Sequence, residues 1–290
     1  MKEIPMHAAA LCAHSAAVPP MDRRHLLLAL RRRQFQPFLQ PIVGADGDWQ
    51  GAEILMRWQH PHAGVLAPAV FLERLSEEGL LAATTRQMLQ QVRTAWRSAP
   101  ACLRQPFVLS FNACGEQLAG EKLVAQCQAL LRRLPWPQLQ LMIEMPERGA
   151  DLGPERCRRL FAQCERADIA IALDDFGIGD ARLHQLACGR ISSLKLDRSF
   201  VAAMQDNSLY SRLIETIVGL AAEFDATVTA EGIETRGQWQ RLRRMGVRRF
   251  QGYYFARPLA MPEFFRQMQR HRDQAATTET AQERECQYGD

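Results

Sequence analysis

The sequence predicts a modified TIM-type (β/α)8 barrel, an α/β fold, in which the first strand is antiparallel to its neighbour. Short apolar runs rich in β-forming residues alternate with longer amphipathic segments. This pattern is typical of βα units and of a parallel sheet. Eight such runs within about 240 residues match the size of one barrel. The turn at 44–47 is too short for a crossover helix, so the strands that it joins must be antiparallel.

The predicted strands are apolar runs such as Phe-Val-Leu-Ser-Phe and Ile-Ala-Ile-Ala-Leu. In chain order they lie at 38–43, 52–58, 107–111, 139–143, 169–173, 193–196, 227–230 and 249–251. The predicted helices have apolar residues at helical spacing. They lie at 22–33, ahead of the barrel, and then at 67–78, 80–99, 115–133, 154–166, 181–187, 209–224, 237–245 and from Met261 toward Arg272.

The composition predicts one globular unit with two tails. Apolar residues make up 47% of the chain and charged residues 23%, which is an ordinary balance for a protein that buries a core. We expect a disordered tail at 1–21, the barrel at 22–272 and a second solvated or disordered tail at 273–290, which lacks an apolar stripe. Neither tail has room for a sensor domain, so we expect regulation from outside the chain.

Charge and cysteine usage exclude several classes of protein. The net charge of +4 is too small to indicate a nucleic-acid polymer as partner, and the arginines at 241–249 read as a solvated helix face. The eight cysteines form no C-x-x-C pair, which favours a reducing cytoplasm over an oxidising compartment. No run approaches the roughly 18 apolar residues of a membrane helix, so we expect a cytoplasmic protein without a membrane partner.

Polar residues accompany nearly every predicted strand. They are Glu53, Asn112, Glu144, Asp174, Asp175, Lys195, Glu231 and Gln251. The carboxyl ends of barrel strands meet at one face, where catalytic groups gather. A single acid just past a strand is often a helix N-cap, but the repetition over successive strands favours a common site. Glu53 fits least well because it opens its apolar run instead of closing it.

Five carboxylates at one barrel mouth would repel one another unless cations neutralise them. Lys195 is the one basic residue that we find among them. Ligands that are all oxygen suit Mg²⁺ or Mn²⁺ better than zinc, and the adjacent Asp174 and Asp175 suit two ions. Two such ions a few ångströms apart are a recurrent device for hydrolysing a phosphodiester. The residues alone therefore predict a metal-dependent phosphodiesterase.

Eight segments also match, in order and spacing, the motifs of one known family. They are Gln40-Pro41-Ile42-Val43, Glu53-Ile54-Leu55-Met56-Arg57-Trp58, Phe111-Asn112-Ala113, Glu144-Met145-Pro146-Glu147, Asp174-Asp175-Phe176-Gly177-Ile178-Gly179, Leu194-Lys195-Leu196-Asp197, Ala230-Glu231-Gly232-Ile233-Glu234 and Gln251-Gly252-Tyr253. By these segments, over nearly the whole of 22–272, the chain resembles the EAL family of cyclic di-GMP phosphodiesterases. Ile54 stands where the motif that names the family has alanine.

The resemblance implies hydrolysis of cyclic di-GMP to linear pGpG with Mg²⁺ or Mn²⁺, at two ions per site. It implies metal ligands at Glu53, Asn112, Glu144, Asp174, Asp175 and Glu231. Catalytic roles fall to Glu53, Lys195 and Glu231, and the sequence leaves open whether Glu231 is a ligand or the general base. The resemblance further implies substrate contacts from Gln40, Arg57, Glu234 and Gln251, and a loop-bracing role for Glu147.

Two departures from the family pattern bear on catalytic rate. Asp180-Ala181-Arg182-Leu183 replaces a Tyr-Ser-Ser-Leu turn, and Pro146 replaces threonine; both changes remove hydroxyls near the loop that carries the aspartates. They favour the alternative of a non-catalytic receptor for cyclic di-GMP or for a protein. A homodimer is common among similar proteins, although no residue pattern here supports it.

Overall fold

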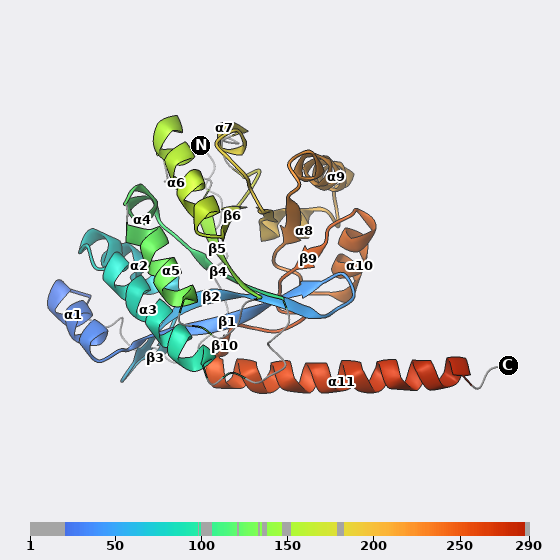
Figure 1. The fold of residues 1–290 in the computed structure, drawn as a ribbon, viewed down its shortest axis with the longest axis horizontal. Coiled ribbons are helices and arrows are strands. Elements are labelled where there is room, and N and C mark those ends of the chain that lie inside the picture. The colour runs from blue at the N-terminus through green and yellow to red at the C-terminus, as the bar shows by residue number, and fades with distance from the viewer. Residues whose placement is uncertain are drawn as a thin grey trace.

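The computed structural model of the protein describes residues 21–97, 99, 106–120, 122–132, 134, 138–146, 152–178 and 183–287. Within these residues the chain folds around one sheet, with helices on its outer side (Figure 1). None of the helices in these ranges combines the length and the apolarity that crossing a bilayer requires.

Eight strands close into a barrel. They are β1 Phe35–Gly44, β2 Trp49–His60, β4 Phe107–Asn112, β5 Leu139–Pro146, β6 Ile169–Asp174, β7 Ser193–Leu196, β8 Thr227–Ala230 and β9 Arg249–Phe250. The order is β1-β9-β8-β7-β6-β5-β4-β2, and the pairing of β2 with β1 closes the ring. β1 is antiparallel to β2 and to β9, and the other neighbours in the ring are parallel. The predicted fold class, including the antiparallel first strand, is confirmed.

The helices cover the outside of this barrel, and several of them begin at a side-chain cap. They are α1 Arg23–Arg31, α2 Pro68–Glu77, α3 Leu81–Trp96, α4 Gly115–Ala119, α5 Lys122–Leu131, α6 Gly153–Arg166, α7 Leu183–Leu186, α8 Arg198–Ala203, α9 Ser208–Glu223, α10 Arg236–Arg244 and α11 Met261–Gln287. Asp22 and Asn207 accept hydrogen bonds from the first turns of α1 and α9. Thr235 and Gln238 form a capping box on α10.

Two separate apolar clusters hold the fold. The larger one lies between the strands and the helices and includes Phe35, Trp58 and Phe71, whose ring centroids are 5.3 to 5.9 Å apart. The smaller one consists of Val108, Met142, Ala170 and Ala172. Because Met142 and Ala172 precede Glu144 and Asp174 by two residues, strand alternation directs this cluster into the barrel.

Three elements of the structure have no counterpart among the predicted elements. The short strands β3 Gly64–Leu66 and β10 Leu259–Ala260 pair antiparallel with β2 and β1, and the six-residue helix α8 follows β7. Each is too short to show a period. At the C-terminal end, α11 continues to Gln287 where the sequence suggested a tail from 273, and it extends beyond the barrel (Figure 1).

Candidate active site

Strand alternation and register bring the predicted side chains to one end of the barrel. Asn112 and Glu144 are partners in the pairing of β4 with β5, and Gln40 is the partner of Glu53 in the pairing of β1 with β2. Glu53 opens its apolar run and nevertheless lies at the mouth. The reason is that β2, which starts at Trp49, leaves the barrel soon after Glu53 and continues to His60. Only its segment from Gly51 to Ile54 pairs with β4.

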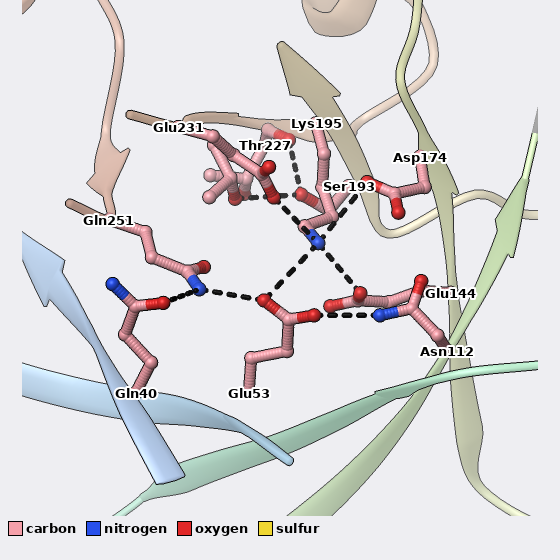
Figure 2. A network of polar contacts seen from close by, with 11 residues as sticks. Gln40, Glu53, Asn112, Glu144, Asp174, Ser193, Lys195, Thr227, Glu231 and Gln251 are labelled. Carbon is pink, nitrogen blue, oxygen red and sulfur yellow. Dashed lines mark hydrogen bonds and ion pairs between the residues drawn. The ribbon is translucent and has the colours of Figure 1, made fainter. Parts of the chain in front are cut away.

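The ammonium group of Lys195 lies at the centre of this mouth, among four carboxylates (Figure 2). Its Nζ atom lies 2.6 Å from Glu144 Oε2 and 2.6 Å from Glu231 Oε1. The same atom lies 3.2 Å from Asp174 Oδ1 and 3.8 Å from Glu53 Oε2. Five different strand ends therefore contribute to one ionic cluster, and the side chain of Lys195 is only 4% exposed.

Two side-chain amides donate hydrogen bonds to the carboxylate of Glu53, one to each oxygen. Asn112 Nδ2 donates to Glu53 Oε1 at 2.7 Å, and Gln251 Nε2 donates to Glu53 Oε2 at 2.6 Å. Gln251 Nε2 also lies 3.3 Å from Gln40 Oε1, and Gln40 Nε2 donates to the carbonyl of Ala256 at 3.1 Å. This chain of amides fixes the Glu53 carboxylate in one orientation (Figure 2).

Burial and mutual repulsion act strongly on the charges of the cluster. Burial raises the pKa of Glu144 well above its usual range, and the neighbouring Glu53 adds to the effect. Burial also raises the pKa of Glu231 to about 8, against the lowering effect of Lys195. Burial by itself would lower the pKa of Lys195, but the surrounding carboxylates outweigh it and raise that pKa well above its usual range. Burial therefore disfavours the ionised form of both glutamates, and further positive charge at the mouth would favour their ionisation.

The donor set at the mouth fits a hard divalent cation. Within the described ranges, no three His, Cys, Asp or Glu side chains are arranged to hold a metal as they stand, and the Lys195 ammonium lies between the carboxylates instead. However, Glu144 Oε1 is buried without a hydrogen-bond partner among the described residues. An unsatisfied carboxylate oxygen within a cluster of carboxylates suits Mg²⁺ or Mn²⁺.

Arg57 lies on the same face of β2 as Glu53, four residues further toward the open end. Burial lowers the pKa of its guanidinium, and Tyr253 and Glu53 are close enough to oppose that shift. Tyr253 is 51% exposed and stacks with Arg257, whose guanidinium carbon lies 4.2 Å from the ring centroid. These groups form a cationic and aromatic rim beside the carboxylates.

A second feature of the rim is an apolar cavity of about 270 Å³ next to Asn112. Leu55 and Met56 line it from β2, and Pro146 lines it from the end of β5. The proline that replaces the usual threonine therefore borders a hollow that opens beside the mouth.

Two of the predicted site residues that lie in loops are exposed, and a third predicted residue lies outside the described residues. Glu234 is exposed, and its backbone N–H donates to Gln238 Oε1. Asp175 is exposed too, with a left-handed backbone (φ 56°). Glu147 and the segment at 179–182 lie outside the described residues, so the loop-bracing role stays a prediction.

The structure adds three hydroxyl groups that the sequence reading missed. Ser193 Oγ donates to the carbonyl of Thr227 at 2.9 Å and lies 3.0 Å from Thr229 Oγ1. Ser110 is fully buried. Each of Ser110, Ser193 and Thr229 precedes a predicted site residue by two positions. The period of a strand could have identified them as the layer below the site.

The comparisons with known proteins show the family of the chain. The EAL domain model matches residues 23–258. The cyclic di-GMP phosphodiesterase RocR of Pseudomonas aeruginosa is 36% identical over 79% of this chain and 58% of its own length. The probable cyclic di-GMP phosphodiesterase PdeN of Escherichia coli is 30% identical over 88% of this chain and 49% of its own. The chain thus spans about half the length of these curated relatives.

A solved structure gives the same result for the fold. The phosphodiesterase PaMucR in complex with c-di-GMP superposes with a TM-score of 0.75 at 28% identity, over 83% of this chain and 98% of that one.

Proposed function

The chain belongs to the EAL domain family, and on this ground we propose that it hydrolyses cyclic di-GMP to linear pGpG with the help of Mg²⁺ or Mn²⁺. The observation that carries the proposal is the ionic cluster of Lys195 with four carboxylates from different strand ends. Burying so many like charges is unfavourable for folding. A purely structural role would not explain why the chain keeps this unfavourable cluster. A catalytic metal site does explain it.

The residues divide into ligands and groups that act on substrate. Glu53, Asn112, Glu144, Asp174, Asp175 and Glu231 would hold two cations. When bound, such ions supply a water of lowered pKa and a positive field for the scissile phosphate. The ammonium of Lys195 would stabilise charge that develops on the phosphate. Glu231, the more exposed of the glutamates that contact Lys195, is either a ligand or the base that accepts the proton of the attacking water.

The rim would position the substrate. The planar guanidinium of Arg57 suits a bidentate contact with a phosphate. Gln40 and Gln251 lie next to Glu53 with buried amides, where they can orient the ligand or the carboxylate. Glu234 lies in the loop after β8 and is exposed, and it would contact the bound nucleotide.

Product formation tests the proposal directly. Purified protein is incubated with cyclic di-GMP plus Mg²⁺, Mn²⁺ or a chelator, and the nucleotides are separated by chromatography. We expect pGpG with either metal and none with the chelator. Glu53→Ala should remove the activity, whereas Glu73→Ala, which changes an exposed glutamate on α2, should retain it.

The receptor alternative gives a different pattern in the same experiment. Tight binding of cyclic di-GMP with no pGpG at any metal concentration would reject the hydrolase and support the receptor. The homodimer stays a separate prediction, which light scattering in solution can check.

A further inference from the structure

A second cavity lies away from the barrel mouth, between α10, α11 and the hairpin that joins β1 to β2. Its volume is about 510 Å³, which is within the range of ligand pockets, roughly 300 to 1,000 Å³. Figure 1 shows α11 passing below α10 and the hairpin. The residues that line the cavity are Gly47, Trp49, Trp239, Tyr254, Phe255, Gln267, Arg270, His271 and Gln274.

One wall of this cavity is aromatic. Trp239 lies 6.1 Å from Tyr254 and 5.5 Å from Phe255 between ring centroids. Trp49 lies 5.7 Å from His271, and its ring is tilted by 32° against the imidazole. The indole N–H of Trp239 is buried and has no hydrogen-bond partner among the described residues. Trp49 is 7% exposed and packs against Phe264 and His271, whereas Tyr254 is 39% exposed and Trp239 is half-buried. The ring surface that is open to the cavity is therefore that of Trp239 and Tyr254.

The opposite wall is polar and belongs to one face of α11. Gln267, Arg270, His271 and Gln274 follow one another at steps of three, one and three residues, which places them on one side of a helix. Where a helix merely packs on an aromatic cluster, this face is apolar. Here amides, a guanidinium and an imidazole line the cavity, and none of the described residues that line it is acidic. Gln267 Nε2 also donates to Glu263 Oε1 at 2.8 Å.

From these two unlike walls we propose that the cavity is a second ligand site, which binds a purine nucleotide. A purine base stacks on tryptophan and tyrosine rings, which is the contact that such rings make with bases in general. The amides of Gln267 and Gln274 match the donors and acceptors on the edge of the base. Arg270 supplies the positive charge for the phosphate. The exposed guanidinium of Arg270, with no acidic residue among the described residues that line the cavity, favours an anionic ligand over an apolar one.

The site has a short physical link to the barrel mouth. Tyr254 and Phe255 line the cavity, while their neighbours Gln251 and Ala256 bond to the amide chain around Glu53. The backbone between them is held by bonds from Tyr254 N to Ile233 O and from Phe255 N to Gly252 O. A nucleotide on the aromatic wall therefore restrains the segment that also carries Gln251.

Binding of guanosine 5′-monophosphate to the full chain tests the site. Calorimetry should give saturable binding that persists in Arg57→Ala, and titration should quench the fluorescence of Trp49 and Trp239. Arg270→Glu should weaken this binding by about tenfold or more, since it replaces attraction to the phosphate with repulsion. Arg244→Glu makes the same charge change at an exposed arginine of α10 outside the cavity and should leave binding unchanged.

Two fragments of the ligand sharpen the test. Guanosine lacks the phosphate and ribose 5-phosphate lacks the base, so each should bind more weakly than the nucleotide, and only guanosine should be indifferent to Arg270→Glu. Binding that is unchanged in Arg270→Glu, binding that is lost in Arg57→Ala, or no binding at all would each overturn the proposal. The measurement needs neither cyclic di-GMP nor turnover, so its failure is distinguishable from failure of the proposed hydrolase.

Discussion

Two adjacent layers of side chains inside the barrel differ sharply in chemistry although the same strands carry them. The mouth layer consists of Glu53, Asn112, Glu144, Asp174, Lys195 and Glu231. The lower layer consists of the residues two positions earlier, namely Gly51, Ser110, Met142, Ala172, Ser193 and Thr229. The mouth layer is mostly charged, whereas the lower layer is neutral, small or apolar.

The difference shows how a barrel separates stability from chemistry. In the lower layer Met142 and Ala172 belong to one apolar cluster, and the hydroxyls of Ser193 and Thr229 share one hydrogen bond. In the mouth layer burial raises the pKa of Glu144 and Glu231, so ionising them is unfavourable in the folded protein. Two residues along a strand therefore separate a layer without ionisable groups from a layer in which ionisation is unfavourable. Changes in the two layers should therefore affect different measurements.

The largest effect is expected for Glu53→Ala, which should abolish turnover and leave the fold intact. The change removes one predicted metal ligand, and loss of a group that only supports such ligands already costs 10- to 100-fold, roughly. It also leaves the amides of Asn112 and Gln251 without their acceptor. Production of pGpG measures the loss of turnover, and the far-UV circular dichroism spectrum shows whether the fold is intact. Full residual activity would remove Glu53 from the site.

Lys195→Met should have the next largest effect, seen as a loss of stability in the metal-free protein. Removing one partner of a buried ion pair costs about 3–5 kcal/mol, because the other charge is left uncompensated. Here four carboxylates share that partner. Urea unfolding in the presence of a chelator measures the loss. Mg²⁺ should add more stability to the variant than to the parent protein, because the cation and the Lys195 ammonium neutralise the same carboxylates. An equal gain in both proteins would contradict this.

Met142→Ala tests the lower layer, with a smaller effect and the opposite signature. Met142 is 3% exposed, and truncation of a buried methionine to alanine costs about 2–5 kcal/mol. We expect unfolding at lower urea with an almost unchanged rate per folded molecule. Met142→Leu, which keeps the volume, should cost less than about 1.5 kcal/mol. If Met142→Ala lowered the rate more than the stability, the two layers would not be separable.

Part of the mouth layer could be predicted from the sequence because strand ends are a local signal. An apolar run followed by Asn112, Glu144 or Asp174 marks both the strand and the end at which the polar group emerges. The central place of Lys195 depends on distances between five strands, which no local pattern contains. For the same reason the sequence predicted cations between the carboxylates and Lys195 beside the cations. In the structure the Nζ atom of Lys195 lies between the carboxylates.

The features that the sequence reading missed are short or scattered along the chain. β3 and β10 have three and two residues, too few for a strand pattern, and they exist because longer strands offer them an edge. The walls of the second cavity come from residues between Gly47 and Gln274, and only the fold shows that they meet. Ser193 and Thr229 are ordinary strand residues by composition, and their contact arises from the pairing of β7 with β8.

Ser193→Ala should have the smallest effect, and it gives the most sensitive test of whether the lower layer contributes to stability alone. The serine hydroxyl bonds Thr227 O at 2.9 Å and lies 3.0 Å from Thr229 Oγ1, and a buried hydrogen bond of this kind contributes about 1 kcal/mol. Urea unfolding should show that loss with unchanged pGpG production. Thr216→Val removes an exposed hydroxyl that bonds a carbonyl at the same 2.9 Å, and it should change stability by less than about 0.5 kcal/mol. If Ser193→Ala also slowed turnover severalfold, the lower layer would help to position Lys195, two residues along the same strand, and the boundary between stability and chemistry would lie one layer deeper.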